Sequence, residues 1–205
     1  SEYLDMFSMY ASGCIGYNHK NIVENKGLLG KVSLFKPTLS DIYTTEYADF
    51  MRVFNETAIP SYLKNTFFIE GGGLAVENAL KVAFDWKVRK NLENGIKDKG
   101  YQILHFKEAF HGRTGYTLSL TNTDPIKTKF FPKFDWPRIT NPYLSFPLDE
   151  TILDNVKEQE KKAINEIKEA LKNNPNDIAA LIIEPIQGEG GDNHFRGTFF
   201  KELKK

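Results

Sequence analysis

Short apolar runs bounded by turn residues predict the strands of this chain. They occupy residues 66–69, 101–106 and 179–183. The last run contains only alanine, leucine and isoleucine, which is typical of a strand buried on both faces at the centre of a parallel sheet. This run leads directly to Glu184, so we expect a charged side chain at the rim of the sheet.

Apolar residues three and four positions apart predict three helices. They span residues 43–54, 74–90 and 150–172. Ser40 or Asp41 is the expected cap of the first helix, and Pro175 is expected to end the last. The predicted buried stripes include Trp86 in the second helix and Leu171 in the third.

The order of these elements is typical of an α/β fold in which helices cover a mostly parallel sheet. Three strands make a thin sheet for this class, and a new helical pattern begins only at residues 199–205. We therefore expect the sequence to be part of a longer protein.

The composition excludes several classes of protein. The 205 residues are 40% hydrophobic, which is sufficient for one sizeable core. Because 27 Lys and Arg balance 27 Asp and Glu, the basic surface of a nucleic-acid-binding protein is not expected. No apolar run approaches the roughly 20 residues of a membrane span, and the first residues do not resemble a signal peptide. The sequence predicts a soluble, cytoplasmic protein.

The cysteine and histidines of the sequence do not predict a metal site. Cys14 is the only cysteine, which excludes a disulfide framework, fits a reducing compartment and predicts a small buried side chain. The four histidines are isolated along the chain, without the spacing of metal ligands. We expect no metal.

Three consecutive glycines, residues 71–73, stand between a predicted strand and a predicted helix. The N-terminus of a helix presents unpaired N–H groups and a partial positive charge, which together favour phosphate. The spacing matches neither the Gly-x-Gly-x-x-Gly motif nor a P-loop. A tight turn without a ligand explains these glycines equally well.

The segment Phe110-His111-Gly112-Arg113 follows the second predicted strand. Phe110 is placed to stack on a flat heterocycle, and Arg113 is placed to bind a carboxylate with both arms of its guanidinium. The alternatives are core packing for Phe110 and a surface ion pair for Arg113. His111 is predicted to be a buried histidine whose hydrogen bonds are satisfied.

Two carboxylates, Glu184 and Glu189, follow the third predicted strand. Ligands of open α/β sheets bind beyond the carboxyl ends of the strands, which favours a functional position for both. They stand five positions apart, across Pro185 and a glycine, so we do not expect them to act as a paired acid and base. The alternative for Glu184 is that it caps backbone amides at the end of the strand.

Taken together and in this order, four segments resemble the class III pyridoxal-phosphate-dependent aminotransferases of fold type I. The segments are residues 70–81, 109–123, 131–139 and 184–195. The resemblance covers nearly the whole chain. It implies that residues 1–35 contribute to a small domain and to the edge of the active site. It also implies that residues 36–205 form part of the large domain that binds pyridoxal 5'-phosphate.

The resemblance also implies roles for individual residues at the cofactor. Gly72 and Gly73 match positions whose backbone holds the phosphate group. Most relatives have a hydroxyl residue where Gly73 stands, so one side-chain bond to the phosphate is expected to be missing. Phe110 matches the aromatic residue that stacks on the pyridine ring, and Glu184 matches a glutamate that shapes the site beside the ring.

At the substrate, the resemblance implies roles for three residues. Arg113 matches the arginine that binds a substrate carboxylate. Glu189 matches a glutamate that pairs with a second arginine when an amine is bound and moves aside for 2-oxoglutarate. Tyr10 falls near the position that lines the substrate end of the pocket.

The activity implied by the resemblance is the transfer of the ε-amino group of L-lysine to 2-oxoglutarate, giving 2-aminoadipate 6-semialdehyde and glutamate. The Schiff-base lysine of the family is expected beyond this chain, so no catalytic residue is assigned here and the chain alone is expected to be inactive. The complete enzyme is expected to be a homodimer. The alternatives are a 4-aminobutyrate or ornithine aminotransferase, a non-catalytic phosphate-binding α/β module, and a non-catalytic assembly piece.

Overall fold

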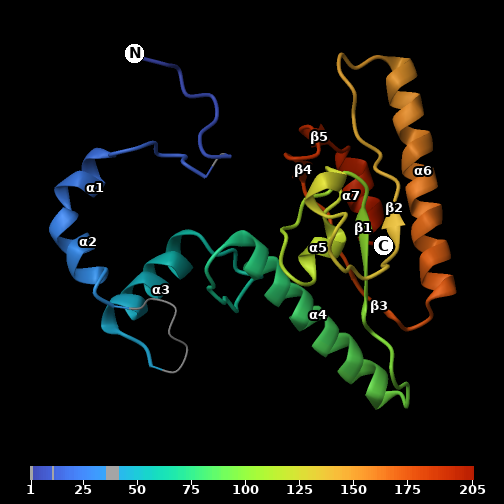
Figure 1. Ribbon diagram of the computed structural model, residues 1–205, viewed down its shortest axis with the longest axis horizontal. Coiled ribbons are helices and arrows are strands. Elements are labelled where there is room, and N and C mark those ends of the chain that lie inside the picture. The colour runs from blue at the N-terminus through green and yellow to red at the C-terminus, as the bar shows by residue number, and fades with distance from the viewer. Residues whose placement is uncertain (1, 11, 36–41) are drawn as a thin grey trace. The chain divides into compact units, whose positions relative to one another are not determined.

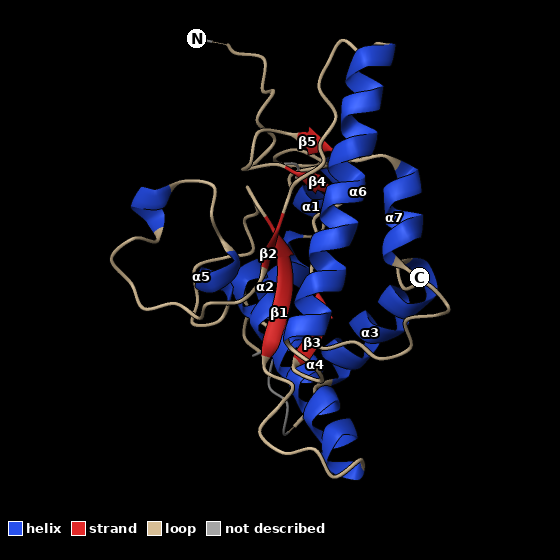
Figure 2. Ribbon diagram, turned by 90° about the vertical axis from the view of Figure 1, so that its right-hand side faces the viewer, coloured by secondary structure: helices blue, strands red, loops and turns tan. Residues whose placement is uncertain are grey.

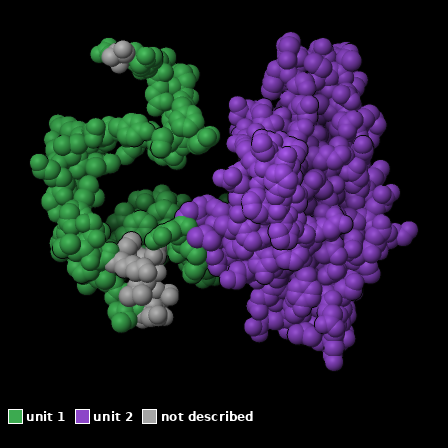
Figure 3. Space-filling view, viewed as in Figure 1, with its two compact units in different colours: residues 1–70 green, residues 71–205 purple. Residues whose placement is uncertain are grey.

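The computed structural model describes residues 2–10, 12–35 and 42–205. The chain divides into two compact units, Ser1–Glu70 and Gly71–Lys205, which are coloured separately in Figure 3. The assignment of residues 1–35 to a small domain and of 36–205 to part of the large domain stays a prediction.

The first unit is helical. Its helices are α1 (Lys20–Glu24), α2 (Lys26–Val32) and α3 (Thr45–Thr57). The Thr44 hydroxyl oxygen accepts a hydrogen bond from the Tyr47 N–H at 3.1 Å and so caps α3. The caps predicted for this helix, Ser40 and Asp41, lie outside the described residues.

Two predictions about the first unit are wrong. Residues 66–69 form no strand, because they pair with no other strand among the described residues. Instead the Phe68 ring packs edge-on against Phe50 and Phe54 of α3, with both centroid distances 5.3 Å. Cys14 is exposed rather than buried, since it lies in an irregular segment in which most residues are exposed.

The second unit contains a three-stranded parallel sheet. The central strand is β1 (Gln102–Phe106), flanked by β2 (Arg138–Ile139) and β3 (Ile178–Leu181). The prediction of a parallel α/β sheet is therefore confirmed. The central position predicted for the run at 179–183 is wrong for this sheet: β3 is an edge strand among the described residues, and its side chains are half-buried.

Helices cover both faces of this sheet. The helices α4 (Gly72–Glu93) and α6 (Glu150–Asn173) lie on opposite faces, as Figures 1 and 2 show. The shorter elements of the unit are α5 (Thr117–Leu120), the 3₁₀ turn η1 (Pro125–Lys127), the antiparallel pair β4 (Ile186–Gln187) and β5 (Asn193–His194), and α7 (Gly197–Leu203). No helix among the described residues is long and apolar enough to span a bilayer.

The alternation of side chains along β1 divides the core into two layers. Leu104 and Phe106 point toward α6 and α7, where Phe199 completes the layer. Ile103 points the other way, toward Leu80 of α4. Burial of apolar side chains on both faces makes β1 the best-covered strand of the described sheet.

The predicted second and third helices are confirmed, but three members of their predicted buried stripes, Ala79, Trp86 and Leu171, are exposed. Trp86 is 56% exposed because it stands two residues after Phe84, and two residues turn a helix by about 200°. Leu171 is 49% exposed, and its neighbour Ala170 packs against the core instead. Asp149 caps the third helix by accepting a hydrogen bond from the Ile152 N–H at 2.7 Å.

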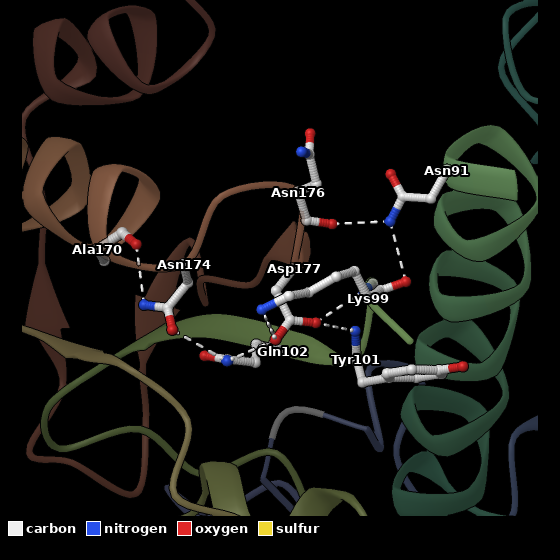
Figure 4. A network of polar contacts seen from close by, with 9 residues as sticks. Asn91, Lys99, Tyr101, Gln102, Ala170, Asn174, Asn176 and Asp177 are labelled. Atoms are coloured by element: carbon white, nitrogen blue, oxygen red, sulfur yellow. Dashed lines mark hydrogen bonds and ion pairs between the residues drawn. The ribbon is translucent and has the colours of Figure 1, made fainter. Parts of the chain in front are cut away.

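Asp177 joins β1 to β3 at their amino ends (Figure 4). Its carboxylate accepts hydrogen bonds from the Gly100 N–H at 2.7 Å, the Tyr101 N–H at 3.0 Å and Gln102 Nε2 at 2.8 Å. Burial alone would raise the pKa of Asp177. The hydrogen bonds from Tyr101, Gly100 and Gln102, helped by the charge of Lys99, outweigh it and hold the pKa below its ordinary value.

We predict that Asp177→Asn lowers the free energy of unfolding of the protein by about 1–2 kcal/mol at pH 7, because it removes one acceptor oxygen and the charge. A depressed carboxyl pKa stabilises the fold above the ordinary pKa, and this stabilisation disappears as the pH falls through the folded-state value. The difference between wild type and variant should therefore shrink below about pH 4. Urea unfolding at several pH values measures it.

The matched control is Asp154→Asn, which removes an exposed carboxylate on α6 that pairs only with surface lysines. It should leave the unfolding midpoint unchanged. An equal loss of stability in the two variants would contradict a specific role for Asp177.

Candidate functional site

The carboxyl ends of β1 and β3 deliver two of the three candidate segments to one edge of the sheet. Because the two strands are parallel, the loop after β1 and the chain after β3 leave the sheet in the same direction. In Figure 1 the β1 arrow points toward the side of the unit where β4 and β5 lie. The third segment, at the N-terminus of α4, meets the other two through the contacts described next.

Gly112 lies against Gly73, the second residue of α4. A Cβ atom built on Gly112 would lie 2.8 Å from the Gly73 Cα and 2.9 Å from the Thr117 Oγ1, and the φ angle of Gly112 is +113°. Both facts require glycine at position 112. A Cβ on Gly73 would meet only the Thr114 methyl at 3.5 Å and the Gly112 Cα at 3.7 Å, which is ordinary contact.

Glu184 connects the chain after β3 to the same loop. Its Oε1 accepts a hydrogen bond from the Phe110 N–H at 2.9 Å. Burial raises the pKa of Glu184, and the hydrogen bonds from the Phe110 and Gly188 backbone only partly offset this effect. The proposed alternative role for Glu184, a cap of backbone amides, is therefore present in the structure and fixes the position of Phe110.

Glu77 of α4 holds the other end of the loop. Its carboxylate accepts hydrogen bonds from the Tyr116 N–H at 3.0 Å and from the Thr114 hydroxyl. Thr121 adds two bonds, accepting from the His111 N–H at 3.0 Å and donating to the Gly112 carbonyl at 2.6 Å. The sequence predicts no role for Glu77, because its partners lie 37–40 residues away and no local pattern signals them.

A buried amide network anchors the β4–β5 hairpin to the loop after β1. The side chain of Gln187 is fully buried and accepts from the side-chain amides of Asn141 at 2.7 Å and Asn193 at 3.0 Å. The same two amides donate to Glu108 Oε2. A Cβ on Gly190 would overlap the Glu108 carbonyl oxygen, so the hairpin packs closely on this loop. Glu189, the residue before Gly190, therefore lies close to the loop after β1.

The Glu189 carboxylate forms an ion pair with Lys127 of η1. The Lys127 ammonium also lies 5.8 Å from the centroid of the Phe110 ring, within the range of a cation–π contact. No local pattern in the sequence predicts this role for Lys127, because Glu189 lies 62 positions further along the chain. Lys127 therefore connects the segment that holds Glu189 with the loop that holds Phe110.

Arg113 and Tyr10 are not joined to these contacts. Arg113 is exposed, and its guanidinium makes no hydrogen bond or ion pair with the described residues. Tyr10 belongs to the first unit and is 82% exposed, with a φ angle of +57°. The roles predicted for both residues remain predictions.

The prediction for His111 is half right. The side chain is buried, but its Nε2 has no hydrogen-bond partner among the described residues. Burial lowers the pKa of His111 to about 4, and the same effect lowers the pKa of the buried His105 to about 4. Both imidazoles are neutral at pH 7. No cluster of metal-ligating side chains occurs in the part of the chain that the structure describes.

The N-terminus of α4 can accept an anionic group. Its cap residue, Gly71, makes no side-chain hydrogen bond to the first turn, and open space surrounds the Cβ positions of Gly71 and Gly72. The first N–H groups of this 22-residue helix are therefore uncapped and carry the positive end of the helix dipole. The residues present fit a phosphate group here, with the half-buried Phe110 nearby for a flat ring.

Comparison with known proteins gives a consistent result. A family model described as "Aminotransferase class-III" matches residues 1–205. L-lysine-epsilon aminotransferase of Mycobacterium tuberculosis (strain H37Rv) is 47% identical, over 99% of this chain and 45% of that protein. Mitochondrial 4-aminobutyrate aminotransferase of Rattus norvegicus is 31% identical, over 98% and 44%. The chain spans about half the length of the curated relatives it matches.

A solved structure agrees with these matches. It is described as lysine aminotransferase from M. tuberculosis in the internal aldimine form. It superposes with a TM-score of 0.93 at 48% sequence identity, covering 100% of this chain and 47% of that chain.

We predict that Gly112→Ala lowers the free energy of unfolding by roughly 2–4 kcal/mol, because the new methyl group meets the Gly73 backbone and the φ angle disfavours any L side chain. Gly73→Ala places a methyl group at the same contact from the other side, where room exists, and should cost little. Chemical denaturation of both variants measures the difference. Equal stability of the two would show that the contact is looser than described.

Proposed function

The chain belongs to the class III aminotransferases, and from this premise we propose that it is part of an L-lysine 6-transaminase. The complete enzyme transfers the ε-amino group of L-lysine to 2-oxoglutarate, giving 2-aminoadipate 6-semialdehyde and glutamate. The observation that carries the proposal is the meeting of the α4 N-terminus, the Phe110–Arg113 loop and the Glu184–Glu189 segment at one edge of the sheet.

The proposed cofactor is pyridoxal 5'-phosphate. When bound, it supplies an electron sink that stabilises negative charge on the carbon bearing the transferred amine. Gly72 and Gly73 would hold the phosphate with backbone N–H groups of the uncapped helix. Phe110 would stack on the ring, and Glu184 holds the backbone of Phe110 in place for that contact.

The residues proposed to contact the substrate are Arg113, Glu189 and Tyr10. The unpaired guanidinium of Arg113 would bind the carboxylate that L-lysine and 2-oxoglutarate both carry at the end away from the reacting carbon. Glu189 would lie beside the reacting carbon, next to Phe110, through its ion pair with Lys127. Tyr10 is proposed at the substrate end of the pocket on the resemblance alone.

These residues bind and orient, and none of them is assigned the covalent chemistry. We propose that the Schiff-base lysine lies in a later part of the enzyme, together with a second arginine, as the family resemblance implies. The residues of this chain therefore form the cofactor cradle and one wall of the substrate site. A homodimer and a cytoplasmic location are also proposed, the former on the resemblance and the latter supported by the single unpaired cysteine.

The second candidate is a 4-aminobutyrate aminotransferase. It is supported by the identity of 31% with the rat enzyme of that name, against 47% with the lysine enzyme. An ornithine aminotransferase of the same class is a further alternative. The non-catalytic phosphate-binding module is disfavoured because the family match covers the whole chain.

The direct test is amine-donor profiling of the full-length enzyme with 2-oxoglutarate as acceptor. We predict that L-lysine gives the highest kcat/KM among L-lysine, L-ornithine and 4-aminobutyrate, measured as glutamate formed. Omission of pyridoxal 5'-phosphate from the apoenzyme is the control and should abolish the reaction. A higher kcat/KM with 4-aminobutyrate would replace the proposal with the second candidate.

We predict that Arg113→Ala in the full-length enzyme lowers kcat/KM for both L-lysine and 2-oxoglutarate. The loss should correspond to about 2–3 kcal/mol of transition-state stabilisation, the scale of a lost charged hydrogen bond. Arg113→Lys should recover only part of this, because an ammonium lacks the two-armed geometry. Arg89→Ala is the control and should leave both values of kcat/KM unchanged, because Arg89 is an exposed arginine of α4 that pairs with Asp85. Unchanged rates for Arg113→Ala with both substrates would remove Arg113 from the site.

A further inference from the structure

Lys127 places a positive charge inside the candidate site. Its ammonium group lies 5.8 Å from the Phe110 ring centroid and pairs with the Glu189 carboxylate. Both residues that it contacts were selected as site residues on other grounds. The side chains of Lys127 and Glu189 are 29% and 32% exposed, so neighbouring protein replaces most of the water around the pair.

The local structure explains why Lys127 reaches this position. Asp124 caps η1 by accepting a hydrogen bond from the Ile126 N–H at 3.0 Å, and Pro125 begins the turn. The Lys129 N–H donates to the Pro125 carbonyl at 2.8 Å and closes the turn. Lys127 therefore projects from a fixed turn rather than from a long loop.

The two proposed substrates differ in charge at the carbon that reacts. The ε-carbon of L-lysine carries no carboxylate, whereas C2 of 2-oxoglutarate carries one. Phe110 is the proposed partner of the cofactor ring, so Glu189 and Lys127 lie beside the place where this carboxylate arrives. An unpaired Glu189 would repel it, and an ion pair reduces that repulsion.

We propose that Lys127 is a specificity-determining residue that admits the carboxylate on the reacting carbon of 2-oxoglutarate by neutralising and holding Glu189. The inference rests on the proposed function, because it concerns one of the two substrates of that reaction. L-lysine brings no carboxylate to this position, so its binding does not depend on Lys127. Lys127 thus favours the dicarboxylate half of the reaction selectively.

The test compares equilibrium binding of glutarate and pentanoate to the full-length holoenzyme by isothermal titration calorimetry. The two acids have the same chain length and differ only in the second carboxylate. In Lys127→Met we expect the Kd of glutarate to rise about fivefold, the effect of one partly exposed charge pair, while the Kd of pentanoate stays unchanged. Lys127→Arg keeps the positive charge and should restore the wild-type ratio.

Lys129→Met is the matched control. Lys129 lies two residues away, and its ammonium is over the exposed Phe130 ring at 4.7 Å, away from Glu189. It should leave both dissociation constants unchanged. Steady-state kinetics should agree, with the KM for 2-oxoglutarate raised in Lys127→Met and the KM for L-lysine unaffected.

The inference is overturned if glutarate binds wild type and Lys127→Met equally, if both acids weaken together, or if Lys127→Arg fails to restore the ratio. Failure of the proposed function has a different signature. In that case the wild-type enzyme forms no glutamate from L-lysine and 2-oxoglutarate, whereas the two acids still report on Lys127.

Discussion

The backbone contact between Gly112 and Gly73 is the constraint on which the candidate site depends. It brings the loop after β1 within van der Waals distance of the first turn of α4, and only glycine at position 112 allows it. Glu77 and Glu184 then fasten the two ends of the loop, to α4 and to the chain after β3. An uncapped helix N-terminus, an aromatic ring and a carboxylate segment are positioned together as a result.

The charges of the site are distributed unequally. Arg113 makes no ion pair with the described residues, whereas Lys127 is paired with Glu189. Burial keeps His105 and His111 neutral, and it favours the protonated form of Glu184. The edge of the sheet therefore presents a free guanidinium, an uncapped helix N-terminus and one neutralised pair, an arrangement that suits an anionic cofactor and carboxylate substrates.

Local patterns in the sequence predicted the strands and helices that need only an apolar surface to pack against. The runs at 101–106 and 150–172 became β1 and α6, because an apolar strand and an amphipathic helix each need only one apolar partner surface. Residues 66–69 look equally like a strand, but without a neighbouring strand the aromatic side chain of Phe68 packs on α3 instead. The edge position of β3 depends on strand order, which no local pattern encodes.

In the candidate site, too, local patterns predicted some residues and gave no sign of those whose partners are distant in the sequence. Phe110 and Glu184 were predicted because each follows a strand, and parallel strands bring such positions to one edge. Gly73 was predicted from its place at the start of a helix, although the strand expected before it does not form. Lys127 and Glu77 were not found, since their partners are distant in the sequence and their own surroundings resemble an ordinary turn and an ordinary helix.

A crystal structure of the full-length protein with pyridoxal 5'-phosphate tests the central claim most directly. We predict that phosphate oxygens accept hydrogen bonds from the Gly72 and Gly73 N–H groups at about 3 Å, and that the Phe110 ring stacks on the pyridine. A phosphate held away from the α4 N-terminus, with Phe110 turned from the ring, would contradict it.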